Sequence, residues 1–180
     1  MIPARNFNPA VKNGAKWLPE DIAGMIGLPS VGEIFYVDPG KSASGGGKSA
    51  DDAFVTLTEA YNAMSADNDD VAIIAPTSST GRTSETASLT WAKRRTHVIG
   101  NGPARVGWNR AGIGFSSDVT TPSMTISANN CSFTNLMIYN SNDVNVLVNH
   151  TGDYNTFNYV HFAGIANTTT GDDTAGRCLV

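Results

Sequence analysis

The sequence of 180 residues predicts an all-β solenoid, in which short strands stack coil upon coil. Two observations lead to this fold class. Short segments rich in Ile, Val, Thr and aromatic residues alternate with Asn, Gly and Asp turns, and no long helix pattern separates them. A shift of 24 residues also lays "CSFTNLMI" at 131–138 over "NTFNYVHF" at 155–162. An ordinary β-sandwich, which also has short strands and turn residues, stays open as the alternative.

The repeat predicts rows of like side chains inside the solenoid, because coils stack at the strand spacing of about 4.8 Å. A weaker echo lays "THVIGN" at 96–101 over "NLMIYN" at 135–140 with an offset of 39, which requires a loop through 103–122 to lengthen that coil. The stronger shift of 24 pairs three apolar positions, and we expect these six residues to form a core ladder: Phe133 with Phe157, Leu136 with Val160, and Ile138 with Phe162.

Eight segments have the composition of strands. The last of them, "CLV", reads as the start of a further coil, so we expect the polypeptide to continue beyond 180 or another subunit to cover this end. The eight segments are 33–37, 71–75, 96–100, 123–126, 135–140, 144–149, 159–162 and 178–180.

One amphipathic helix is predicted at about 53–65, in "AFVTLTEAYNAM". Ser49 and Asp52 would cap its first turn. Four apolar residues recur at helical spacing along one side, and such a stripe must lie on an apolar surface. We expect a structural cap over the end of the coil stack, formed by Phe54, Leu57, Tyr61 and Met64.

The glycine-rich stretch "SASGGGKS" at 42–49 has the setting of a phosphate-binding loop, because a strand precedes it and a helix follows. The first glycine of that motif, however, would fall at Ser42. Asp51 and Asp52 stand where the helix would present its N–H groups to a phosphate, and their charges would repel it. We therefore expect a connector loop, and no cofactor is predicted.

Residues 1–32 differ from the rest of the chain, with four of the eight prolines and little apolar periodicity. A short helix at "PEDIAGMI" is the exception, with Pro19 near its start. We interpret 1–32 as an extended arm that is ordered only against a neighbouring protein, and 33–180 as the main domain. The residues that attach the arm would be Phe7, Trp17 and Leu18.

Composition argues against several partners. The formal net charge of −4 and the pI of about 5.2 give no broad attraction to nucleic acid. No segment has the apolar length of a signal peptide or a membrane span, so we expect no membrane insertion. Two distant cysteines, Cys131 and Cys178, indicate small buried thiols rather than a metal site or a disulfide framework.

Residues 34–165 carry a resemblance to a known family. The stretch "FYVDPGKSASGGGKSADDAFVTLTEAYNAMSADNDDVAIIAP" is similar to the opening of pectate-lyase-like right-handed parallel β-helix proteins, and "THVIGNGP" and "NCSFTNLMIYNS" resemble their following coils. The resemblance implies a right-handed parallel β-helix whose N-terminal end is capped by the helix at about 53–65. Members include enzymes that cleave acidic polysaccharides and bacteriophage appendage or virion proteins, and fold alone does not choose between them.

The residues that an enzyme of this kind needs are missing from the pattern. A lyase requires carboxylates for calcium and a basic residue, and a hydrolase requires two or three neighbouring carboxylates. Beyond Arg110 the acids are few, and most stand in turns. His97 reads as a core or wall residue, Trp91 as a packing residue, and the run 93–95 as a solvated edge or a contact for an acidic partner. We expect no catalytic and no metal-binding residues.

The sequence therefore predicts a non-catalytic bacteriophage virion protein, such as a tail spike, a fibre or a capsid-surface protein. Residues 1–32 would dock it to other virion proteins, and its location would be the virion, an extracellular particle. A second copy of the chain, giving a homo-oligomer, and a host-surface glycan are the other partners that we expect. The alternative is a carbohydrate-active β-helix enzyme or a polysaccharide-binding module.

Overall fold

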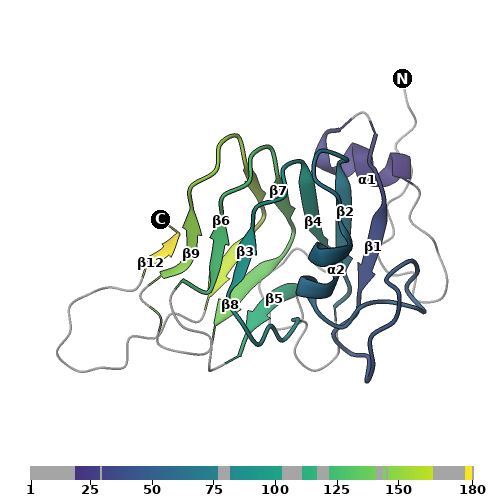
Figure 1. Ribbon diagram of the computed structural model, residues 1–180, viewed down its shortest axis with the longest axis horizontal. Coiled ribbons are helices and arrows are strands. Elements are labelled where there is room, and N and C mark those ends of the chain that lie inside the picture. Colours follow the sequence, from purple (N-terminus) through teal and green to yellow (C-terminus); the bar gives the residue numbers. More distant parts are fainter. Residues whose placement is uncertain are drawn as a thin grey trace.

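The structure, a computed structural model of the chain, describes residues 19–28, 30–76, 82–102, 111–116, 122–140, 144, 146–163 and 177–179 (Figure 1). Most of the ordered elements are short strands, and all the strand pairings found among these residues are parallel. The prediction of an all-β class is confirmed at this level. No helix in the described part of the chain is long and apolar enough to cross a membrane.

The strands form three parallel sheets, which the chain visits in turn, so that β4, β5 and β6 are followed by β7, β8 and β9 and then by β10, β11 and β12. The first sheet has the order β1-β2-β4-β7-β10: Ile34–Val37, Asp70–Ile74, Thr96–Gly100, Ser132–Thr134 and Thr156–Asn158. The second has the order β11-β8-β5: His161–Ala163, Met137–Asn140 and Gly112–Phe115. The third has the order β12-β9-β6-β3: Arg177–Leu179, Val146–His150, Met124–Ile126 and Leu89–Trp91.

The strand register confirms the repeat of 24 residues. Phe157 pairs with Phe133 in the first sheet, and Phe162 pairs with Ile138 in the second. The weaker echo is wrong, because Ile99 pairs with Thr134 in the first sheet, whereas Ile138 belongs to the second. The strand that precedes β8 in the second sheet is β5, which lies inside the stretch expected to be only a loop.

Two predicted strands are divided by corners. The segment 135–140 begins at Asn135, whose φ of 55° turns the chain between β7 and β8. The segment 159–162 begins at Tyr159, whose φ of 54° makes the equivalent turn between β10 and β11. Left-handed backbone geometry interrupts the extended conformation, so each predicted strand becomes a corner followed by a shorter strand.

A common apolar core lies between the three sheets. It takes Val98 from the first sheet, Ile113 from the second and Ile126 from the third, all fully buried. Aromatic rings continue this core along the stack, with centroid distances of 4.6 Å from Tyr61 to Trp91, 5.6 Å from Trp91 to Phe133 and 5.4 Å from Phe133 to Phe157. Of the expected ladder, the buried members of the core are Phe133, Leu136 and Ile138, and the partly buried residues that pack against it are Phe157, Val160 and Phe162.

The second helix, α2, spans Leu57–Ala63 and begins later than the predicted start near residue 53. Phe54 forms a parallel bridge with Val37 beside β1, so the chain is still extended there. The true N-cap is Thr56, which forms a capping box with Glu59, whereas Ser49 and Asp52 form a turn before it. Of the expected cap, Leu57 and Met64 lie in the core, and Phe54 and Tyr61 pack against it.

The first helix, α1 at Pro19–Ile26, covers the outer face of the first sheet near β1 and β2 (Figure 1). Its Ile22 is fully buried in a second apolar cluster with Tyr36, Val71, Ile73 and Ile99. Residues 19–26 therefore pack within their own chain, contrary to the expectation that the whole of 1–32 is ordered only against another protein. The expected attachment residues Phe7, Trp17 and Leu18 lie outside the described residues.

Candidate functional site

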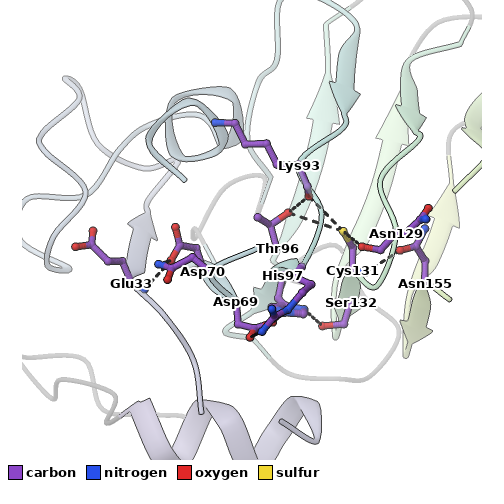
Figure 2. A network of polar contacts seen from close by, with 12 residues as sticks. Glu33, Asp69, Asp70, Lys93, Thr96, His97, Asn129, Cys131, Ser132 and Asn155 are labelled. Carbon is purple, nitrogen blue, oxygen red and sulfur yellow. Dashed lines mark hydrogen bonds and ion pairs between the residues drawn. The ribbon is translucent and has the colours of Figure 1, made fainter. Parts of the chain in front are cut away.

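Corners with left-handed geometry precede four neighbouring strands of the first sheet. The register aligns these corner residues with one another, since Asp70 pairs with Thr96, His97 with Ser132 and Ser132 with Thr156. One side of the first sheet therefore carries a row of stacked corners, and the best-connected polar side chains of the described structure lie along it (Figure 2). The corner residues, with φ between 53° and 58°, are Asp69, Arg95, Asn130 and Tyr154.

Three side chains from this row form a continuous hydrogen-bonded chain. His97 Nδ1 lies 2.8 Å from Ser132 Oγ on the neighbouring strand, and His97 Nε2 lies 3.4 Å from Asp69 Oδ1 (Figure 2). An ionised carboxylate only accepts hydrogen bonds, so the neutral imidazole carries its proton on Nε2 and accepts from the Ser132 hydroxyl at Nδ1. The polar order is that of a serine, a histidine and an aspartate in a hydrolase.

Arg95 fixes the charge of this chain. Its Nε lies 3.1 Å from Asp69 Oδ1, and its terminal nitrogen binds the other carboxylate oxygen. Burial would raise the pKa of Asp69, but the hydrogen bonds from Arg95 and His97 outweigh it and lower that pKa. Burial lowers the pKa of His97, with Asp69 opposing the shift. At neutral pH the chain therefore contains an ionised carboxylate and a neutral imidazole.

The location of Ser132 decides what this chain can do chemically. A serine nucleophile needs access to substrate and N–H donors for the oxyanion. Ser132 is 8 % exposed, His97 is 3 % exposed, and β7 pairs with β4 on one side and β10 on the other. The hydroxyl is thus enclosed in the sheet, and the hydrogen bonds join β4 to β7 and to the corner before β2.

Buried carboxylates elsewhere bind the chain's own backbone. Asp70 accepts from the backbone N–H of Glu33 and of Ser65, each at 2.7 Å. Glu85 accepts from Leu57 N at 2.8 Å and from both the N–H and the hydroxyl of Thr58, at the N-terminus of α2. Both carboxylates therefore satisfy backbone donors. Glu85 was missed by sequence reasoning, because 28 residues separate it from Leu57 and no local pattern connects them.

The basic run 93–95 is used inside the molecule. Lys93 Nζ donates to the carbonyl oxygens of Tyr61 at 2.6 Å and Met64 at 2.8 Å, at the C-terminal end of α2. Arg94 pairs with Asp67 at 2.8 Å, and Arg95 binds the corner carboxylate described above. The run therefore joins the corner to the helix, and the prediction of a merely solvated edge is wrong for Lys93 and Arg95.

The glycine loop also has its donors occupied. Gly45 N donates to Ala53 O at 2.9 Å, and Gly47 N donates to Asp52 O at 2.6 Å. A Cβ at Gly45 or Gly46 would overlap the Asp52 carboxylate, which lies where a phosphate would sit against such a loop. The loop backbone is thus bonded to the segment that follows it.

Asparagines complete the row of corners farther along the sheet. Asn155 accepts from Cys131 N at 2.8 Å and donates to Ala128 O at 2.7 Å, joining two neighbouring corners. Cys131 is a buried free thiol, as expected. Trp91 is buried in the core, as its interpretation as a packing residue predicted.

Among the described residues, no group of three His, Cys, Asp or Glu side chains is placed to hold a metal ion. No model of a known protein family matches this chain, and neither does any curated protein or solved structure. The arguments about function therefore rest on the residues and their contacts.

Proposed function

We propose that the three parallel sheets are the three faces of a right-handed parallel β-helix, with α2 as the cap at its N-terminal end. The successive visits to the first, second and third sheets support this, because one such circuit is one coil of a solenoid. The parallel register with a period of 24 residues supports equal stacking of the later coils. Right-handedness follows the strong preference of parallel crossover connections.

On this fold we propose a non-catalytic structural role in a bacteriophage virion, as a tail spike, fibre or capsid-surface protein. One observation carries the non-catalytic part: the buried carboxylates Asp70 and Glu85 are committed to backbone donors, and Asp69 to Arg95 and His97. Cleavage of a polysaccharide needs carboxylates that face the substrate. The virion part rests on the sequence resemblance of residues 34–165.

In this proposal the chain acts as a homo-oligomer, and its N-terminal segment docks it to other virion proteins. The packing of α1 on the first sheet restricts the docking role to the residues before Pro19. A segment that is not needed for the apolar core is available for a partner. Docking would therefore leave the β-helix itself unchanged.

Quantitative mass spectrometry of gradient-purified phage particles tests the virion role. We expect peptides from 34–165 to copurify with the major capsid protein at a fixed ratio through successive gradients. Finding the chain only in the soluble fraction of the lysate would contradict the proposal. As a control, a host cytosolic protein of similar abundance should be lost from the particle fraction.

The alternative function is polysaccharide binding or cleavage, and one observation favours its binding form: two strongly exposed tyrosines lie on the last described coil. Cleavage is tested by incubating the purified chain with polygalacturonate and with neutral polysaccharides. New reducing ends that are lost in an Asp69→Asn variant but retained in a Thr90→Ala variant would replace the structural proposal with an enzymatic one. We expect none.

A further inference from the structure

Tyr154 and Tyr159 are the large apolar side chains that stand most open in the described part of the chain, with exposed fractions of 85 % and 72 %. They flank β10 at its two corners, and Thr156 and Asn158 are exposed on the strand between them. The pair therefore borders one outward-facing strip, which we name the β10 strip.

The conformation of these tyrosines is unusual for their residue type. Their φ angles are 56° and 54°, in the left-handed region that bulky side chains rarely adopt. The equivalent corners one coil earlier are Asn130 and Asn135, with φ angles of 58° and 55°. Asparagine tolerates this region much better than tyrosine.

The chain thus places tyrosine at both corners of one coil where asparagine would serve the fold better. Neither ring lies in the apolar core, so burial does not offset the strain. Strained residues that the fold does not require are concentrated at functional sites. The two rings are accordingly best explained by something that they contact outside the chain.

The charge of the strip restricts the contact. Thr156 and Asn158 are neutral, and the sequence has no Lys or Arg between 111 and 176. Nucleic acid and acidic polysaccharides both need a cationic surface, which this coil lacks. Asp153, exposed beside Tyr154, would repel them further.

The middle of the strip argues against a stable protein interface. Such interfaces have an apolar centre and a polar rim. Here the polar residues Thr156 and Asn158 form the centre, and the aromatic rings stand at the two ends. A ligand with hydroxyl groups along its length and apolar ring faces would match both parts, since tyrosine presents an apolar face with a polar tip.

We propose that the β10 strip binds a neutral saccharide chain. Tyr154 and Tyr159 stack on sugar rings at either end, and the Thr156 hydroxyl and the Asn158 amide bond sugar hydroxyl groups between them. At a rise of about 3.3 Å per residue, the five steps from one tyrosine to the other span about 16 Å, long enough for an oligosaccharide. The inference rests on the proposed virion role only for the source of the saccharide, a host surface.

Affinity electrophoresis of the full chain tests the proposal, with gels containing dextran, a β-glucan or a galactomannan, and polygalacturonate as the acidic comparison. We expect retardation by at least one neutral polysaccharide and none by polygalacturonate. The double variant Tyr154→Asn/Tyr159→Asn should lose at least about tenfold in affinity, an effect of about 1.4 kcal/mol. Thr90→Ala, an exposed change on the third sheet, should leave binding unchanged.

A second measurement separates a ligand contact from a structural role. The double variant relieves two strained corners, so its Tm should rise by about 2–4 °C per site while binding is lost. A fall in Tm, binding that survives the double variant, or no binding to any of the neutral polysaccharides would overturn the proposal. Self-association that the variant abolishes, without saccharide binding, would instead identify a protein interface. Presence of the chain in virions is measured separately, so failure here leaves the proposed virion role testable.

Discussion

The two ends of the first sheet differ in what covers their outer faces. At the β1–β2 end, Tyr36, Val71 and Ile73 point outward and are buried beneath α1. At the β10 end, the outward residues Thr156 and Asn158 are exposed between two tyrosines. The same parallel backbone is therefore closed by apolar packing at one end and presented to solvent at the other, so stability and recognition are located in different coils.

The largest expected effect distinguishes the middle of the core from its far end. Phe133 is fully buried between Trp91 and Phe157, so Phe133→Ala should cost about 3–5 kcal/mol of the free energy of unfolding. Phe157 is only partly buried, and Phe157→Ala should cost clearly less. Urea denaturation of both variants measures the difference. Equal losses would show that both rings are enclosed to the same extent.

The cap end should be almost as sensitive. Leu57 is fully buried under α2, so Leu57→Ala should cost about 2–5 kcal/mol. Thr58→Ala, on the neighbouring position but less buried, serves as the matched comparison. A loss for Leu57→Ala well under this range, by thermal or urea denaturation, would mean that the helix does not seal the core.

A smaller effect is expected where a carboxylate caps α2. Glu85→Gln keeps one acceptor oxygen but removes the charge that faces the helix N-terminus, so it should cost about 1–3 kcal/mol. Glu59→Gln is the matched control, because glutamine also serves in a capping box. If urea denaturation gives the two variants the same stability, the long-range contact from Glu85 contributes little.

The smallest effect concerns pH and the corner row. The pKa of folded His97 lies below its unfolded value of about 6.5, so the neutral form is favoured by folding. The free energy of unfolding should therefore decrease as pH falls from 7 toward 5, because the unfolded state then binds more protons. Asp69, whose pKa is lowered from a value of 3.8, contributes only at more acidic pH.

Replacement of the histidine sharpens this test. His97→Gln should flatten the dependence of stability on pH between 7 and 5, as measured by urea denaturation at intervals across that range. The amide still offers a donor and an acceptor to Asp69 and Ser132. A variant with the same slope as the native chain would show that His97 does not report on this interval.

The sequence predicts the repeat well where consecutive coils have equal length. Phe133 and Phe157 are in register because no insertion separates their coils, so one offset of 24 reveals both. The offset of 39 failed because Asn135, at a corner, was compared with a strand residue. The strand β5 was also missed, since its "GIGF" has two glycines in four residues and lacks the composition of a strand.

Most of the polar site could not be predicted, because its contacts join distant residues. His97 and Ser132 are 35 residues apart, and Lys93 is 29 residues from Met64. Strands of three to five residues are too short for a periodic signal to show which side chains face outward. The tyrosines at the corners were hidden for a different reason, since turn positions normally predict Asn or Gly rather than an aromatic residue.

Hydrogen–deuterium exchange of the intact chain tests the contrast between the two ends of the first sheet most directly. Amide protection reports local opening, which follows packing and hydrogen bonding. We predict slow exchange for peptides covering β1, β2 and α1, and clearly faster exchange for the peptide covering β10 and β11. Equal protection at both ends, or fast exchange across residues 19–37, would contradict the account of one end closed by its own chain and one end open to a ligand.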